Sequence, residues 1–211
     1  MRIITTILLL FAAASATTAQ DYGNVVTDAT AQLDKIKSAS IATQSIESDF
    51  SLEKKVAIMT NLEKSYGKFY YNRASGKLCL DYTQPPENKI IISDTKFTLK
   101  TNGKISTMEL SRNPALSQLK NMITACMTGN FISLGEHSQT KYYDNGEIFT
   151  ISIKPSNKRV KRYMSEIILR FEKKDNTLLS MRFAEQNGDY SEYTYTNKKI
   201  NAGIDDRHFL P

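Results

Sequence analysis

Few residues of this chain could perform catalysis, and none of them stands in a pattern that enzymes use. The 211 residues include two histidines, His137 and His208, and two cysteines, Cys79 and Cys126. There is no HExxH, GxSxG or CxxC motif, so the spacings of a metal site, a serine nucleophile and a redox dithiol are missing. An acidic pair precedes His208 and could orient its imidazole, but a solvated turn accounts for the same residues. The sequence therefore predicts a protein that is not an enzyme, with no catalytic residue, metal ligand or cofactor.

The two cysteines leave two structures open. Two thiols allow one disulfide in an oxidising compartment. Cys79 is predicted to lie on the opposite face of its strand from Leu78 and Leu80, and Cys126 is predicted to lie in a helix. The alternatives are a bridge between the two cysteines or two small, buried hydrophobic side chains.

The chemistry that the sequence does favour is binding by apolar side chains. Within residues 67–100, Leu78, Leu80 and Tyr82 alternate with polar or smaller residues, and a period of two places all three on one face of a strand. A proline pair ends that strand, and the isoleucine run at 90–92 starts the next one. An apolar surface of this kind gains about 0.8 kcal/mol for each CH₂ group that it removes from water.

Two amphipathic helices are predicted to accompany these strands. Residues 24–40 carry apolar side chains at three- and four-residue spacing, with Asn24 as the cap. Between residues 102 and 129 the pattern leaves the sheet. Residues 114–128 are expected to form a second helix, which would cover the face that carries Leu78.

The rest of the sequence predicts antiparallel strands. Residues 44–52 alternate apolar and polar side chains, which indicates a half-buried strand. After residue 131, four turn signals separate further alternating segments, which is typical of a continuing meander. The length suits a single domain at residues 20–211.

These features resemble a known family. Arg73, Leu78, Leu80 and Pro85, followed by the segment IIISD, are similar to the RPxxFxW…P…SDG pattern of the LolA-like carriers of outer-membrane lipoproteins. Leu78 and Leu80 stand where that family has Phe and Trp, and Thr95 stands where it has Gly. The predicted lining is therefore smaller and less aromatic than in the family.

The resemblance implies a mainly β fold with α (α+β). It would be a strongly curved, incomplete antiparallel β-barrel of about ten or eleven strands, with helices covering the concave face, as in LolA and LolB. The closing segment would return to the sheet with Phe209 buried. The arginine that matches Arg73 lies at the rim of the family's cavity and contacts the backbone of the lid helix, here residues 114–128; a plain surface arginine is the alternative. The residues expected to bind acyl chains are Phe50, Leu78, Leu80, Tyr82, Ile91, Phe97, Leu116, Leu119, Ile123 and Met127.

The resemblance also implies a non-catalytic periplasmic carrier. Such a carrier would bind the acyl chains of lipoproteins in a hydrophobic half-barrel cavity and shuttle them from the inner to the outer membrane. Its partners would be acylated lipoproteins, an inner-membrane lipoprotein-releasing ABC transporter and an outer-membrane acceptor, and it would act as a monomer. The alternatives are a half-barrel that carries another acyl lipid or senses lipoproteins, and an envelope scaffold whose apolar face is only core.

The charge of the chain bears on other partners. The formal net charge is +6, but the sequence lacks the basic runs with interleaved aromatic residues that nucleic-acid platforms use, so no nucleic-acid partner is expected. The densest basic segment is KRVKR at residues 158–162. It is either a solvated strand end or a docking patch for an anionic membrane surface or an acidic partner.

The first residues predict export. Arg2 precedes an apolar stretch at residues 3–14, and Thr17 and Ala19 are the small residues of a cleavage site, so residues 1–19 have the pattern of a secretory signal peptide. A transmembrane anchor is the alternative, but the apolar stretch is shorter than the ~20 residues that a spanning helix needs. The expected location is the periplasm.

The mature protein should begin at Gln20. N-terminal mass spectrometry of exported protein checks this prediction, and retention of Met1 in that material would contradict it.

Overall fold

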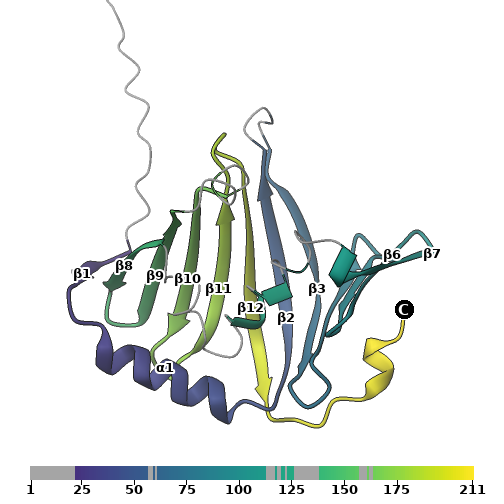
Figure 1. Cartoon of the computed structure of the whole chain (residues 1–211), viewed down its shortest axis with the longest axis horizontal. Helices are drawn as coiled ribbons and strands as arrows, with labels where there is room; N and C mark the ends of the chain where they lie inside the picture. The colour runs from purple at the N-terminus through teal and green to yellow at the C-terminus, as the bar shows by residue number, and fades with distance from the viewer. Residues whose placement is uncertain are drawn as a thin grey trace, which may run out of the picture.

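The computed structural model describes residues 22–56, 59, 61–112, 117, 120–121, 123–125, 138–156, 161 and 164–211. They form one antiparallel sheet of twelve strands in the order β1-β8-β9-β10-β11-β12-β2-β3-β4-β5-β6-β7 (Figure 1). The strands are β1 (Asn24–Val26), β2 (Ser45–Lys55), β3 (Glu63–Asn72), β4 (Lys77–Gln84), β5 (Lys89–Ile92), β6 (Lys96–Thr101), β7 (Lys104–Glu109), β8 (Ser138–Asp144), β9 (Ile148–Pro155), β10 (Glu166–Glu172), β11 (Thr177–Ala184) and β12 (Tyr190–Ile200). The other described elements are the helix α1 (Thr30–Ala42) and the short 3₁₀ helices η1 (Leu110–Arg112) and η2 (Asp206–Phe209).

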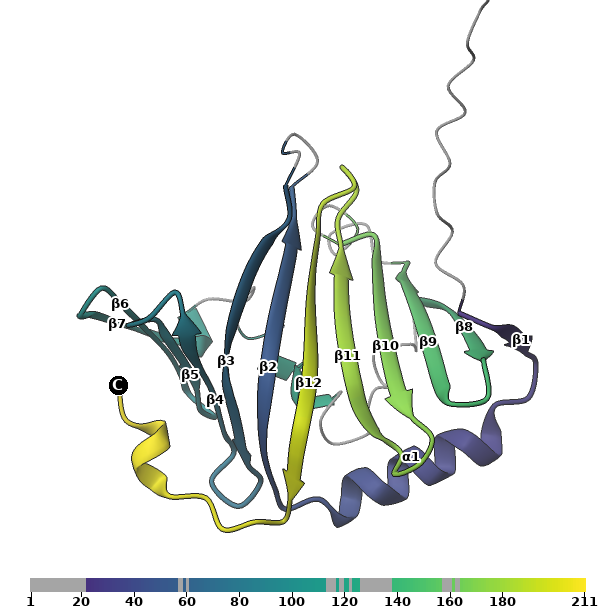
Figure 2. The same cartoon turned by 180° about the vertical axis from the view of Figure 1, so that it is seen from behind.

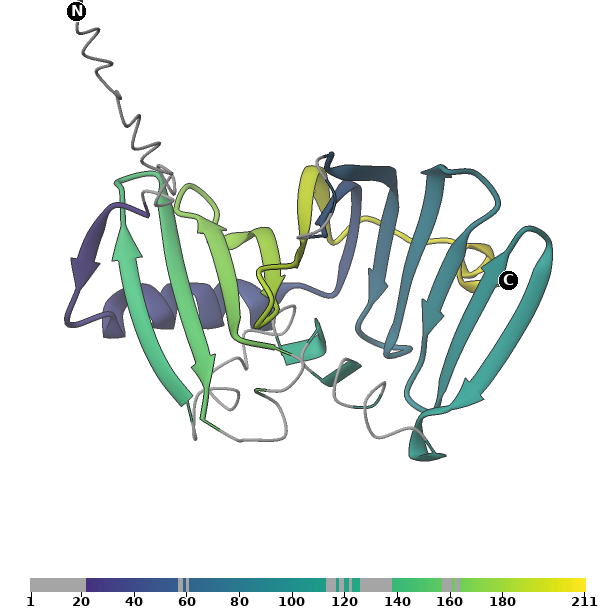
Figure 3. The same ribbon diagram turned by 90° about the horizontal axis from the view of Figure 1, so that it is seen from above.

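The sheet confirms the predicted fold class. The described chain is mainly β with few helices, and the two edge strands, β1 and β7, do not pair with each other, so the sheet is open. It has twelve strands, where about ten or eleven were expected. Seen from above, the sheet is bent, with β2, β3 and β12 near its middle and the two edges on either side (Figure 3).

One face of the sheet is apolar because side chains alternate along each strand. In β9, Ile151 and Ile153 are buried on this face, while Ser152 points to the other. The register continues the pattern, because Leu169 of β10 lies opposite Ile151 and Ile167 lies opposite Ile153. Each such aliphatic side chain contributes about 1.5–3 kcal/mol when it is buried. We call this surface, whose buried residues form one cluster, the apolar face and the other surface the outer face.

Helix α1 begins later than predicted. The sequence pattern placed a helix at residues 24–40 with its first residue as the cap, but residues Asn24–Val26 pair with β8 as β1. Two consecutive valines beside the free edge of β8 favour the strand, since β-branched side chains pack well there. The helix begins at Thr30, whose backbone N–H donates to Asp28 Oδ1 at 3.0 Å. Its stripe packs on the apolar face, where Ile36 is fully buried.

The chain also stays in the sheet longer than predicted. Residues 104–109, expected to leave it, form β7 and pair with β6 across the turn Asn102-Gly103, where both residues have positive φ. All six side chains of β7 are exposed, so no alternation of apolar and polar residues marks this strand in the sequence.

The second predicted helix is described only in part. Ser117, Lys120, Asn121 and residues 123–125 are helical, as the pattern predicts. Ile123 belongs to the buried cluster of the apolar face, so this segment covers the same face as α1. The predicted residues Leu116, Leu119, Cys126 and Met127 lie outside the described residues.

The C-terminal segment covers part of the outer face. Phe209 of η2 is buried there against Tyr70, Cys79 and Ile91, which confirms the expected return of the closing segment. His208 stacks on Tyr70 with 4.0 Å between the ring centroids. Cys79 is a free thiol, and burial raises its pKa to about 12, so it stays protonated near neutral pH. Of the two structures left open for this cysteine, the protein has the buried thiol.

Gly67, near the middle of the sheet, allows two aromatic rings to meet. It lies in β3, opposite Phe50 of β2 and Tyr82 of β4. A Cβ atom at this position would lie 2.6 Å from the Phe50 ring and 2.2 Å from the carbonyl oxygen of Asp81. Because no side chain intervenes, the Phe50 and Tyr82 rings make an edge-to-face contact with 5.1 Å between their centroids.

Gly67→Ala should destabilise the protein. The added methyl group must displace the Phe50 ring and also clashes with a backbone oxygen, so we expect the unfolding free energy to fall by about 1–3 kcal/mol or more. Gly203→Ala is the matched control, because no heavy atom lies within 4 Å of its Cβ position. Urea unfolding followed by circular dichroism measures both variants, and equal midpoints would contradict the prediction.

Candidate functional site

A pocket opens on the apolar face where β3, β4 and β5 approach the C-terminal end of α1. The strand register builds its floor, because Leu78 of β4 lies opposite both Tyr71 of β3 and Ile92 of β5. Its volume is about 290 Å³. The apolar residues that line it are Tyr71, Leu78, Ile92 and Ile123, and the charged ones are Arg73, Asp94 and Lys120. The pocket thus combines an apolar floor with a charged rim.

Arg73, at the rim, bonds to the end of α1. Its Nε donates to the carbonyl oxygen of Thr43 at 2.7 Å, and its Nη2 donates to that of Ser40 at 2.6 Å. These carbonyls lie at the C-terminal end of the helix, where the helix dipole is negative and a cation is stabilised. Arg73 is therefore more than a plain surface arginine. Its bonds to α1 differ from the contact that the resemblance implied with residues 114–128, and a latch on that segment stays a prediction.

A second ionic contact borders the same pocket. Lys120 Nζ lies 2.9 Å from Asp94 Oδ1, which ties the helical segment around Lys120 to the turn between β5 and β6. The Lys120 side chain is largely buried, whereas that of Asp94 is exposed. Two of the elements that cover the apolar face, α1 and the segment around Lys120, are thus each held at the pocket rim by a cation.

The structure brings most of the predicted lining residues together. Phe50, Leu78, Leu80, Phe97 and Ile123 are buried in the cluster of the apolar face, and Tyr82 packs against it. None of the first five is more than 9% exposed, so the surface that we predicted to bind a ligand is covered in this structure. Leu116, Leu119 and Met127 lie outside the described residues.

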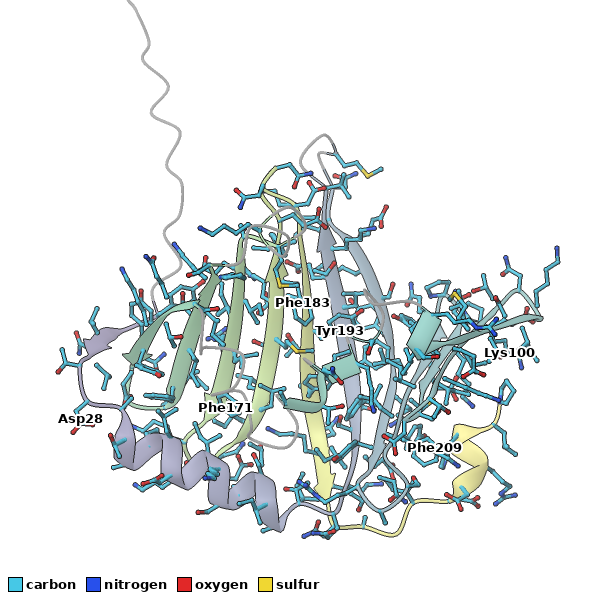
Figure 4. All side chains as sticks on the ribbon, in the orientation of Figure 1. Asp28, Lys100, Phe171, Phe183, Tyr193 and Phe209 are labelled. Carbon is cyan, nitrogen blue, oxygen red and sulfur yellow. The ribbon has the colours of Figure 1, made fainter. Side chains whose placement is uncertain are left out.

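Two phenols place polar atoms within the apolar face. Tyr82 and Tyr193 are hydrogen-bonded to each other, and the Phe50 ring lies 6.3 Å from that of Tyr193. Burial raises the pKa of both phenols, so both stay neutral near neutral pH. Figure 4 marks Tyr193 of β12 beside Phe183 of β11 along the middle of the sheet. This part of the face can bind a ligand without carrying charge.

The prediction for Ile91 is wrong. Ile91 pairs with Cys79 and packs on the outer face against Phe209, so it cannot contribute to the apolar face. The reason is the period of two: in the run of three isoleucines, Ile90 and Ile92 point to the apolar face and the middle one points away. A continuous apolar run indicates a strand that is buried on both faces, and this signal could have placed Ile91 correctly.

Other residues of the pocket were not predicted from the sequence. Ile92 and Tyr71 could have been found, because they follow from the alternation in β5 and β3 once Leu78 is placed. The pairing of Asp94 with Lys120 depends on how a distant helix docks, and no local spacing indicates it.

Two further features of the described residues bear on the site. Among the described residues, no group of three or more His, Cys, Asp or Glu side chains is placed to hold a metal ion. None of the described helices has the length and apolar character needed to span a membrane.

Comparison with solved structures shows the fold. MucB is similar, with a TM-score of 0.54 and 12% identity over 88% of this chain and 63% of that chain. A chain of the Pseudomonas aeruginosa MucA/MucB complex gives a TM-score of 0.52 and 12% identity over 87% of this chain and 61% of that one. An uncharacterised conserved protein from Thermus thermophilus gives a TM-score of 0.52 and 10% identity, over 87% of this chain and 93% of that one. The chain thus spans about three fifths of the matched chains in the MucB and MucA/MucB structures.

Comparison by sequence shows the family. No curated protein matches the chain. A family model, described as outer membrane lipoprotein carrier protein LolA, matches residues 42–211, which include every strand from β2 to β12 and the whole pocket rim. The chain therefore belongs to the LolA family of outer membrane lipoprotein carrier proteins.

Proposed function

We propose that this protein is a periplasmic carrier that binds the acyl chains of lipoproteins on its apolar face and shuttles them from the inner to the outer membrane. The observation that carries the proposal is the continuous apolar face of an open sheet, which helices cover and which ends in a pocket. Membership of the LolA family supports the same function. Residues 1–19 would direct export, and the mature domain would act as a monomer.

The pocket is the starting point for binding and not the whole site. Its volume of about 290 Å³ is at the lower limit of ligand pockets, which hold roughly 300–1,000 Å³. An acyl chain of about a dozen carbons gains on the order of 10 kcal/mol from burial before the costs of association. Entry of such a chain requires the space that Ile36 of α1 and Ile123 now fill. Cargo and cover therefore compete for the same apolar surface.

The partners in this proposal are those of a transfer chain. Acylated lipoproteins would be received from an inner-membrane lipoprotein-releasing ABC transporter and passed to an outer-membrane acceptor. Reversible transfer needs a cover that reopens, and the polar contacts of Arg73 and Lys120 at the rim can break without exposing the sheet core. The similar structures support protein partners as a class, since MucB forms a complex with MucA.

A second cargo is favoured by the charge of the rim. Arg73 and Lys120 are two cations beside one acidic side chain, Asp94. An acyl lipid with an anionic head group would place its chain on the apolar floor and its charge near these cations. A carrier of such a lipid is the alternative function for the same site.

Leu78→Trp should block binding of acyl chains. The indole ring enters the pocket that Leu78 lines, so the domain stays folded while the affinity for a fluorescent acyl probe falls by roughly tenfold or more. Val25→Trp, on an exposed residue of β1, is the matched control and should bind as the parent chain does. Native mass spectrometry of periplasmic protein should also show acyl adducts on the parent and the control but not on Leu78→Trp. A folded Leu78→Trp variant with unchanged affinity, or a parent chain that never carries an adduct, would favour a scaffold.

Arg73→Leu should loosen the end of α1 and slow delivery. It removes two hydrogen bonds from a charged group, each worth about 1.5–3 kcal/mol, so amide hydrogens in the last turn of α1 should exchange faster. Onward transfer should slow because the closed, empty state that favours release is destabilised. Arg73→Lys is the control, because lysine keeps the charge but lacks the forked geometry of the guanidinium. Its amide exchange and transfer rates should lie between those of the parent and those of Arg73→Leu. Unchanged exchange and unchanged transfer between purified carrier and acceptor would exclude this role.

A further inference from the structure

The end of the sheet away from α1 carries apolar and basic side chains together. Strand β2 ends there at Lys55 and β3 begins there at Glu63, and the antiparallel register brings the end of β9 and the start of β10 to the same end. Figures 1 and 2 show this end at the top and α1 along the bottom. We call it the loop end.

Two apolar side chains at the loop end lie outside the core. Met59 is 49% exposed and Leu62 is 42% exposed, and both belong to the connection between β2 and β3. The backbone N–H of Met59 donates to the carbonyl oxygen of Val56 at 2.8 Å, so a turn presents this side chain. Single exposed apolar residues are common on proteins, but two within four positions on one connection form a small apolar surface.

Basic side chains lie along the same end of the sheet, on the connection that carries these two residues and, beyond β10, β11 and β12, at the end of β9. Lys54, Lys55 and Lys64 flank the connection and are exposed. Lys154 and Lys161 line a polar pocket of about 310 Å³ at the end of β9. Lys161 belongs to the segment KRVKR, which is part of the connection from β9 to β10.

Acidic side chains lie at this end as well, and some of them are engaged. Glu53 lies 3.5 Å from Lys64 and accepts a hydrogen bond from the Tyr190 hydroxyl at 2.9 Å. Glu166 accepts one from Ser152 Oγ at 2.5 Å. The others are Glu63, Glu185 and Asp189.

We propose that the loop end is a docking surface for an anionic membrane. Met59 and Leu62 enter the head-group layer, and the lysines along the same end of the sheet contact lipid phosphates. Apolar and basic side chains on one surface are what an interfacial segment needs, because burial in the bilayer and attraction to anionic lipid add together. An acidic protein would satisfy the lysines but would leave the two apolar side chains in water, and this difference favours the membrane.

Docking in this way leaves the cargo pocket accessible. Strand β3 runs from the loop end to the pocket rim, and its ten residues span about 33 Å at 3.3 Å per residue. Arg73 and the pocket therefore face away from the membrane while the loop end contacts it. The proposal goes beyond acyl-chain binding and does not depend on which cargo is carried.

The chain has no tryptophan, so a single tryptophan reports docking. In Met59→Trp, fluorescence should shift to shorter wavelength on adding vesicles of phosphatidylethanolamine with phosphatidylglycerol, and not on adding phosphatidylcholine vesicles. Ile41→Trp, on an exposed residue of α1 at the opposite end, is the control and should not respond. Flotation of the mature protein with the same vesicles measures the affinity. It also separates docking from extraction of single lipids, because only protein that stays bound to the vesicles floats with them.

Two pairs of substitutions locate the surface. Lys154→Gln with Lys161→Gln should weaken vesicle binding by about tenfold or more, since each lysine near an anionic surface contributes about 1 kcal/mol. Lys35→Gln with Lys37→Gln on α1 removes the same charge from exposed residues of the other end and should have little effect. Met59→Ser with Leu62→Ser should also weaken binding, and high salt should not restore it.

Each of the following outcomes would overturn the proposal. If the parent protein fails to float with anionic vesicles at low salt, the loop end does not dock on membranes. If the parent fails to float but binds polyglutamate, the partner is an acidic protein and not a membrane. If Met59→Ser with Leu62→Ser binds as the parent does, or if the two lysine pairs weaken binding equally, attraction is general and this surface is not the docking site.

Discussion

The structure depends on how a sheet with one apolar face is covered. Twelve antiparallel strands present buried side chains on one side, and no second sheet packs against them in the described residues. Bending the sheet brings its two halves closer and reduces the area that must be covered (Figure 3). The remaining area is covered by side chains of α1, of η1 and of the segment around Ile123. The helical cover takes no part in strand pairing, so removing it would break no hydrogen bond between strands.

The outer face is stabilised differently in its two halves. Over β3, β4 and β5 the C-terminal segment adds a second apolar layer, and Lys89 Nζ donates to the Leu210 carbonyl oxygen at 2.9 Å to hold it. Over β10, β11 and β12 ion pairs take the place of this apolar layer. One example is Arg182 Nη2, which lies 2.5 Å from Glu192 Oε2. The half that carries the pocket is therefore buried on both faces. It forms the floor of the pocket.

Much of the fold could be predicted from the sequence, because most strands alternate apolar and polar side chains and their turns carry Gly, Asn and Asp. The errors have physical causes. Strand β1 and the start of α1 were missed because pairing with β8 overrode a helical spacing. Strand β7 was missed because neither of its faces is buried. Ile91 was misplaced because the run of isoleucines was assigned to one face, whereas a continuous apolar run indicates burial on both faces. The contacts of Arg73 and Lys120 depend on helix docking, which no local pattern encodes.

In the proposed carrier, the rim accounts for a cover that is both stable and removable. An apolar cover alone would compete with cargo on equal terms, since both gain about the same free energy for each Å² that they bury. Arg73 adds polar bonds to α1 that cargo does not replace, so they favour the empty, closed state. The substitution of Leu for aromatic residues at Leu78 and Leu80 acts in the same direction, because a smaller lining binds an acyl chain less strongly. In this chain the balance between cover and cargo is therefore expected to lie toward release.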